Sequence, residues 1–298
     1  MRRSFRLSKV NGFRKRKYRG GQLLNTEYVK VIKKHHGLIS IDFNELWRYR
    51  ELFWFLALRD ILVRYKQAVI GIAWSILQPL FTMVVFSVIF GRLAKLPSDG
   101  VPYPILIFTA LLPWQFFAHS MSASSQSIVG SASIISKVYF PRLIIPTSAV
   151  ISGTIDFCIS FVILIGMMVW YKIVPTANIV YLPLFVLLTF TAALAVGLWL
   201  SALNAEFRDV FYVVPFLVQA GQYISPVAYS SSIIPEKWKF LYSLNPMVGV
   251  IDGFRWSILG TATPHWIDIT ISAASVLVIF TGGLLYFRKM ERTFADVI

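Results

Sequence analysis

The sequence predicts an all-α integral membrane protein. It has six transmembrane helices, an N-terminal amphipathic helix in the membrane interface, and a re-entrant or short-helix hairpin between spans 5 and 6. Two observations predict this class. The 298-residue chain is 56% hydrophobic and only 14% charged, whereas a soluble domain is about 25% charged. The charges are also absent from long windows, each of which can supply the ~20 residues of helix that a bilayer core requires.

The predicted spans follow one another after Lys66 as six apolar windows. Asp156, in the third window, is their only acidic residue. A charged Asp at the bilayer centre costs about 2.5–3.5 kcal/mol, so its side chain is expected to face protein or water. One acid makes a poor proton relay, which favours a structural role over a substrate contact. The windows are residues 67–91, 100–136, 143–171, 173–205, 210–235 and 269–287.

Two segments of different character precede the spans. Residues 1–41 form a basic arm, predicted to be cytoplasmic and largely disordered. Such an arm can bind anionic lipid or nucleic acid, and beside six spans the lipid surface is favoured. Residues 42–67 mix apolar and charged side chains at near-helical spacing, which predicts an amphipathic interfacial helix. A surface helix of a soluble subdomain is the alternative. The six-span domain then covers residues 68–298.

The distribution of Lys and Arg predicts that both termini are cytoplasmic. If they are, the inner loops are 126–142 and 204–209. Without the first 41 residues, the inner side then carries 11 Lys and Arg and the outer side 6. Positive residues near spans favour the cytoplasmic side. Residues 233–263 are too polar to cross and too apolar to lie free, so they are expected to form the outer hairpin, with Trp238 and Trp256 at headgroup level.

The sequence offers no candidate for catalysis or metal binding. It has no phosphate-binding loop, its four histidines show no metal-ligand spacing, and Cys158 is its single cysteine. The residues therefore give no support to an enzyme. A membrane-embedded glycosyl- or phosphotransferase would need clustered acids on an inner loop, where only Glu206 and Asp209 stand. An ion-coupled carrier would need several intramembrane charges.

Two spans carry aromatic and amide side chains on one helical face. Sugar rings stack on aromatic faces, and amides exchange hydrogen bonds with hydroxyl groups, so such faces suit a sliding sugar chain. Helix packing with polar contacts between helices is the alternative interpretation. The candidate conduit residues are Trp74, Gln78 and Phe81 in the first span, and Phe211, Gln219, Gln222 and Tyr223 in the fifth.

Four segments resemble the permease subunits of polysaccharide-exporting ABC transporters, most closely the O-antigen branch. The resemblance runs from about Asp42 to the C-terminus. Exporters of teichoic acid or capsular polysaccharide are the alternative within the same class. The segments are RDILVRYKQAVIGIAWSILQPL (59–80), SKVYFPRLIIP (136–146), SALNAEFRDVFYVVPFLVQAGQYISPVAY (201–229) and LNPMVGVIDGFRWSILG (244–260).

The resemblance implies a homodimer in the bacterial cytoplasmic membrane, whose two halves line a channel for an undecaprenyl-linked polysaccharide. Two copies of a separate subunit would bind and hydrolyse ATP with Mg²⁺, so this chain itself would hold no cofactor. Because the first and fifth spans would line the channel, the resemblance also supports the sugar interpretation of the conduit residues.

The resemblance further implies where the ATPase subunit docks. The interfacial helix would contact it through Arg59 and Arg64, and the second cytoplasmic segment through Lys137, Tyr139 and Arg142. A charged side chain next to an aromatic ring can anchor between helices of a partner. Ordinary positive-inside anchoring is the alternative role for Lys137 and Arg142.

Overall fold

The computed structural model describes residues 13–14, 29–30, 43–65, 69–261, 265–291 and 293–294. The chain divides into two compact units, Met1–Ser40 and Ile41–Ile298. In the first unit, β1 (Phe13–Arg14) pairs antiparallel with β2 (Val29–Lys30). The rest of the predicted disordered arm lies outside the described residues, and its boundary stays a prediction.

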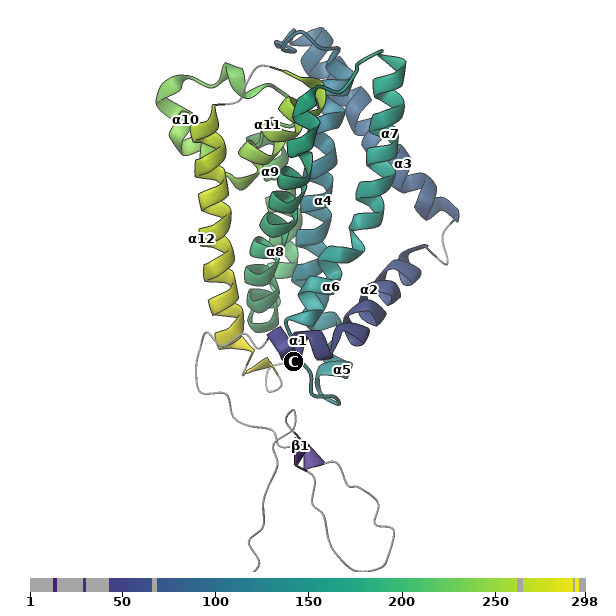
Figure 1. The fold of residues 1–298 in the computed structure, drawn as a ribbon, viewed down its shortest axis with the longest axis vertical. Helices are drawn as coiled ribbons and strands as arrows, with labels where there is room; N and C mark the ends of the chain where they lie inside the picture. Colours follow the sequence, from purple (N-terminus) through teal and green to yellow (C-terminus); the bar gives the residue numbers. More distant parts are fainter. Residues whose placement is uncertain are drawn as a thin grey trace, which may run out of the picture. The chain divides into compact units, whose positions relative to one another are not determined.

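The segment predicted as one amphipathic helix forms two helices, α1 (Phe43–Arg48) and α2 (Arg50–Tyr65). They are separated at Tyr49, whose N–H donates to Leu46 O in a three-residue turn. In Figure 1, α2 runs obliquely to the long helices of this unit. One face of α2 buries Leu56 and Ala57. The opposite face exposes large apolar side chains, including Trp54 and Phe55.

Five helical segments of the described chain are long and apolar enough to cross a membrane. This confirms the predicted all-α membrane class. The first is α3 (Val69–Phe86), which continues as the π-helix η1 (Ser87–Leu93). The others are α4 (Tyr103–Gly130), α6 (Ile144–Ser152) with α7 (Thr154–Trp170), η2 (Ala177–Tyr181) with α8 (Leu182–Glu206), and α12 (Trp266–Met290).

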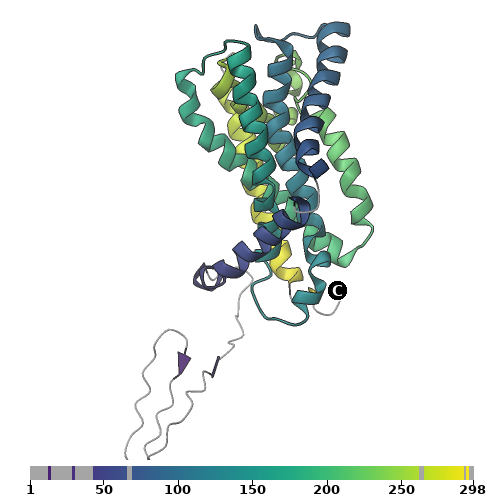
Figure 2. The same ribbon diagram turned by 90° about the vertical axis from the view of Figure 1, so that its right-hand side faces the viewer.

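The window predicted as the fifth span contains a shorter helix, α9 (Val210–Ile224). Its 15 residues rise about 22 Å, less than the ~30 Å of a bilayer core. The helix ends because Pro226 disfavours a helical backbone at the residue before it, and Ser225 is extended (ψ 155°). Green in Figure 2, α9 stands at the edge of the bundle, and within it only Val214 is buried. The count of six spans therefore stays a prediction.

The core of this unit is built around α4, which packs against α3, α6, α7, α8 and α11. Its most apolar window is 78% buried, against 11% for the window in the first span, so α4 is central and α3 peripheral. A second apolar cluster lies near the C-terminal ends of α4, α8 and α12. It joins Leu56 of α2 to Ile145 of α6 and Phe287 of α12. The middle of α2 therefore belongs to the folded core.

Short helices connect α9 to α12: η3 (Ser231–Ile233), α10 (Glu236–Ser243) and α11 (Pro246–Leu259). Asn245 caps α11 by accepting a hydrogen bond from Met247 N at 3.0 Å, and Gly260 ends it at φ 65°. Apolar residues occur all around α11, and it is buried against α4, α8 and α12. Trp256 is consequently 6% exposed, so the headgroup position expected for it is wrong, whereas Trp238 is 54% exposed.

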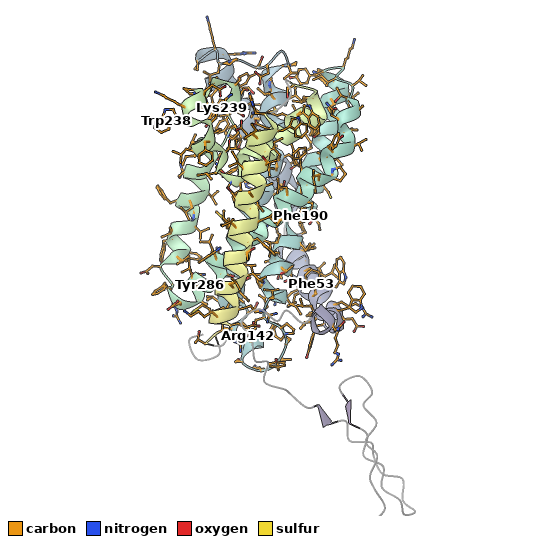
Figure 3. All side chains as sticks on the ribbon, turned by 60° about the vertical axis from the view of Figure 1, so that its left-hand side comes forward. Phe53, Arg142, Phe190, Trp238, Lys239 and Tyr286 are labelled. Carbon is orange, nitrogen blue, oxygen red and sulfur yellow. The ribbon has the colours of Figure 1, made fainter. Side chains whose placement is uncertain are left out.

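Segments predicted to lie on opposite sides of the membrane occupy opposite ends of this unit. Figure 3 shows Trp238 and Lys239 at one end, and Phe53, Arg142 and Tyr286 at the other, with Phe190 between them. A short helix, α5 (Ala132–Ile135), precedes α6 at the same end as Arg142. The arrangement matches the predicted order of loops along the membrane normal.

We expect Gly253→Ala to reduce the stability of the membrane unit. A Cβ at Gly253 would lie 2.1 Å from the ring of Phe185, which is fully buried and cannot move aside. Such overpacking costs about 1–3 kcal/mol. The thermal midpoint of the detergent-purified protein should fall. Gly166→Ala is the matched control, because a Cβ there meets nothing within 4 Å. Equal midpoints for the two variants would contradict the close α8–α11 contact.

Candidate functional site

A polar cavity of about 300 Å³ lies between α2, α3, α4, α7 and α9. This volume is at the lower end of the range found for ligand sites in proteins. The walls carry amide and hydroxyl groups, which is unusual for a region formed by apolar helices. The polar and charged lining residues are Arg64, Ser75, Gln78, Thr82, Gln115, His119, Ser122, Asp156, Ser160 and Gln222, and Trp114 and Phe116 are among the apolar ones.

One corner of the cavity is charged. Arg64 Nη1 of α2 lies 2.6 Å from Asp156 Oδ2 of α7, and the adjacent Tyr65 hydroxyl donates a hydrogen bond to Asp156 Oδ1. Arg64 Nη1 also lies 2.6 Å from His119 Nε2. A guanidinium can only donate, so a hydrogen bond at this distance requires the ring nitrogen to accept. Burial, and then the hydrogen bond to Asp156, raise the pKa of Tyr65, which keeps its hydroxyl protonated as a donor.

Asp156 of the third span therefore faces protein, and it lines a cavity that is large enough for water molecules. Its structural role stays a prediction, now with named partners. The pairing of Arg64 with Asp156 joins residues 92 positions apart, so no local spacing could have found it. Arg64 lies on the cavity wall, and its expected contact with an ATPase subunit stays a prediction.

Two of the predicted conduit residues, Gln78 of α3 and Gln222 of α9, line the cavity. Sequence reasoning missed Gln115, although its spacing from Ser122 places both on one face of the second span. The wall closes where Trp114 of α4 approaches α9. A Cβ at Gly221 would lie 2.7 Å from the Trp114 indole, so this close approach needs glycine.

The other predicted conduit residues lie outside the cavity, on exposed faces of α3 and α9. Trp74 is 59% exposed and Phe81 72% exposed. On α9, Phe211, Gln219 and Tyr223 are also exposed. The Tyr223 ring lies 6.2 Å from that of Phe86, which joins α9 to the end of α3. The two helices thus present aromatic and amide groups on their exposed faces.

The predicted ATPase contacts separate into two groups. Lys137 and Tyr139 are exposed between α5 and α6, where Tyr139 O accepts a hydrogen bond from Tyr49 at 3.2 Å. Arg142 also contributes to the fold: its backbone N–H donates to Glu291 Oε1 at 3.0 Å, and its guanidinium donates to Glu291 O. Its contact with the ATPase subunit stays a prediction. Arg59 pairs with the neighbouring Asp60 at 2.8 Å.

A second polar cavity, of about 260 Å³, lies at the end of the unit that carries Trp238 and Lys239. Its main element is Arg255 of α11, which is 3% exposed. The guanidinium donates to three backbone carbonyls, those of Leu106, Val227 and Tyr229. Val227 and Tyr229 lie between α9 and η3, where no helix pairs their carbonyls, so the buried guanidinium satisfies them. Sequence reasoning missed this residue, because the carbonyls it binds carry no side-chain signal.

Four serines and three carboxylates also line the second cavity. Ser230 Oγ donates to Asp99 Oδ2 at 2.5 Å, and Ser231 Oγ donates to Asp252. Burial raises the pKa of Asp252 to about 6, partly offset by Arg255 and by the Ser231 hydrogen bond. Across the described residues, no group of three His, Cys, Asp or Glu side chains could hold a metal ion. The hydrogen bonds between serines and carboxylates link the loop that contains Asp99 to η3 and α11.

Comparison with known proteins gives the class. The ABC-2 type transporter family matches residues 51–259, well over half of the chain. The protein belongs to this family of membrane permeases, which confirms the resemblance found in the sequence and the predicted multi-pass membrane location.

Particular relatives are similar over most of their length. The O-antigen export system permease protein RfbA of Klebsiella pneumoniae is 29% identical over 242 residues, 80% of this chain and 92% of its own. The protein of the same name from Myxococcus xanthus is 28% identical, over 85% of this chain and 98% of its own. The inner membrane transport permease YadH of Escherichia coli K12 is 25% identical over 62% of this chain.

We expect the protein to become more stable as pH falls from 7.5 to 5.5, through Asp252. Because its folded-state pKa of about 6 lies above the ordinary value of 3.8, the folded state binds the proton more tightly, and stability is lost as pH rises through 6. The thermal midpoint should therefore rise on acidification. Asp252→Asn should remove that part of the pH dependence, and an unchanged midpoint-against-pH curve in this variant would contradict the assignment.

Proposed function

We propose that the protein is the channel-forming permease subunit of an ABC transporter that exports an undecaprenyl-linked O-antigen polysaccharide across the bacterial cytoplasmic membrane. The observation that carries this proposal is the similarity to O-antigen export permeases over 80–85% of the chain. YadH, whose printed name specifies no polysaccharide, is less similar and covers less of the chain.

The proposed assembly is a homodimer with two copies of a separate ATPase subunit, and both termini are cytoplasmic. The exposed faces of α3 and α9 support a dimer, because they place the amides of Gln78 and Gln219 where lipid offers no hydrogen-bond partner. A sixth crossing would combine α9 with the turns that follow Ser225. ATP and Mg²⁺ would bind to the partner subunit, and this chain would contribute no nucleotide site.

The proposed conduit runs along α3 and α9. Trp74, Phe81 and Tyr223 would offer flat apolar surfaces to sugar rings, while Gln78 and Gln222 exchange hydrogen bonds with hydroxyl groups. Each contact is weak and replaceable, so a long chain can advance without falling into one tight site. The ATPase would dock at the end that carries Lys137 and Tyr139, where an exposed cation and ring stand together.

The direct test is to delete the gene in its host and identify the glycan that accumulates on undecaprenyl lipid inside the cell. An O-antigen-type polymer that is absent from the surface is the expected result. Accumulation of a polyol-phosphate polymer would reassign the protein to teichoic acid export, and a capsular polymer would reassign it to capsule export. Loss of polymer synthesis without accumulation would point to an enzyme and overturn the proposal.

Lys137→Glu should weaken docking of the ATPase subunit, because a repulsive charge replaces an exposed positive one. Loss of such a surface contact is worth about 1 kcal/mol, or about fivefold in affinity. Co-purification of the two subunits at graded salt concentrations measures it. The control is Lys237→Glu, an exposed lysine next to Trp238 at the other end of the unit. Equal weakening by both variants would count against the docking assignment.

Combining Trp74→Ala with Phe81→Ala should slow polysaccharide export while leaving the protein folded. Both rings are mostly exposed in the protomer, so their removal leaves no cavity in its core. Stacking of a nucleic-acid base on an aromatic side chain is worth about 1–3 kcal/mol. If sugar rings stack comparably, loss of two aromatic rings should slow export at least tenfold. Surface glycan after a pulse of synthesis gives the rate. Val162→Ala, also exposed, is the control, and undiminished export in the double variant would exclude these rings from the conduit.

A further inference from the structure

We propose that Asp156 is a positioning residue that holds the end of α2 against the wall of the 300 Å³ cavity, so that a displacement of α2 changes that wall. The inference rests on the proposed function, since it assigns the displacement to the ATPase subunit. It gives the intramembrane acid a role in coupling, whereas its proximity to Arg64 alone would assign it only to folding.

The grip on α2 has two points. Arg64 and Tyr65 are the last two residues of α2. The Arg64 guanidinium contacts Oδ2 of Asp156, and the Tyr65 hydroxyl donates to Oδ1 of the same carboxylate. One contact would fix a distance and leave the helix free to turn. Two contacts from adjacent residues also fix the rotation of the helix end. His119 of α4 contacts the same guanidinium, so three helices meet at this point.

The second attachment of α2 is apolar and lies about two turns earlier. Leu56 is 1% exposed and belongs to the cluster that contains Ile145 of α6. This attachment holds the middle of the helix in the core. A helix fixed at its middle can transmit a tilt to its end, and the charged grip is where that tilt would reach the cavity.

The grip is strong enough to position α2 and can still be released. The side chains of Arg64 and Asp156 are 40% and 20% exposed, and both line a polar cavity. Separating these charges therefore does not place them in a dry interior, where an unpaired ion would cost several kcal/mol. Gln115 and Ser160 line the same cavity. Each can accept a hydrogen bond from the released Arg64 guanidinium or donate one to the released Asp156 carboxylate.

Release would alter the surface that faces the proposed conduit. Gln78 and Gln222 line the same cavity as Asp156 and stand on α3 and α9. If Arg64 withdraws, the cavity gains a carboxylate facing its interior and loses one wall. The position of α2 is thereby coupled to the polar groups that a sugar chain would meet.

The test uses the full transporter, reconstituted with its ATPase subunit, and measures polysaccharide exported per ATP hydrolysed. Asp156→Asn keeps the size of the side chain and its acceptor for Tyr65 but removes the charge that holds Arg64. We expect about a tenfold drop in export per ATP, within the usual range of coupling between sites. ATPase binding and the thermal midpoint should change little. Glu236→Gln, which breaks an exposed ion pair of 2.5 Å, is the matched control.

The charge swap that combines Arg64→Asp with Asp156→Arg restores the attraction with the signs reversed, and it should recover most of the export per ATP. A purely structural role predicts a different result: Asp156→Asn would lower the amount of folded transporter while each remaining molecule exported normally. That result, or normal export in Asp156→Asn at full yield, would overturn the proposal. A wild-type complex that hydrolyses ATP without exporting glycan would instead refute the proposed function.

Discussion

The structure depends on how closely other helices approach α4. Gly197 of α8 leaves room for Ser124, since a Cβ there would lie 2.6 Å from the Ser124 hydroxyl, and Gly153 does the same for Ser120. Small residues allow such close approach between membrane helices, where lipid supplies no hydrophobic drive for association. Asn204 adds a hydrogen bond from its side-chain amide to Ser125 O at 2.9 Å. The helices α3, α7 and α9, which form the other walls of the cavity, each pack on α4, whereas the end of α2 reaches it through the contact of Arg64 with His119.

The first span and α9 differ from the other helices in how much of their surface is exposed. They expose more apolar surface than the other spans, and the aromatic side chains along them have few neighbours within the protomer. Lipid can cover apolar side chains, but it offers no partner for Gln78 or Gln219, whose amides are exposed on the same helices. A face that mixes rings and amides therefore suits a partly aqueous boundary better than bulk hydrocarbon.

The sequence predicted those features that depend on neighbouring residues along the chain. Absence of charge over twenty residues predicts a helix in the membrane, and the cost of one carboxylate predicts that Asp156 faces protein. It was uninformative where a contact joins distant segments. Arg255 reads as an ordinary outer cation, yet it binds carbonyls of Leu106 and Tyr229. Trp256 reads as an interfacial anchor and is buried, because α8 and α12 cover it from both sides. The spacing of the candidate conduit residues identified the helix faces on α3 and α9, but it could not identify the polar cavity next to them.

The end of the first span has one further consequence. Gly91 in η1 leaves space for the Tyr103 ring, which a Cβ would meet at 2.8 Å, and the Tyr103 hydroxyl donates to Ala228 O at 2.7 Å. The same stretch of backbone is held by Arg255 through Val227 and Tyr229. The first span, the second span and the hairpin are thereby tied into one stiff cap. The end of α2 is held less firmly, because its polar contacts converge on the single carboxylate of Asp156.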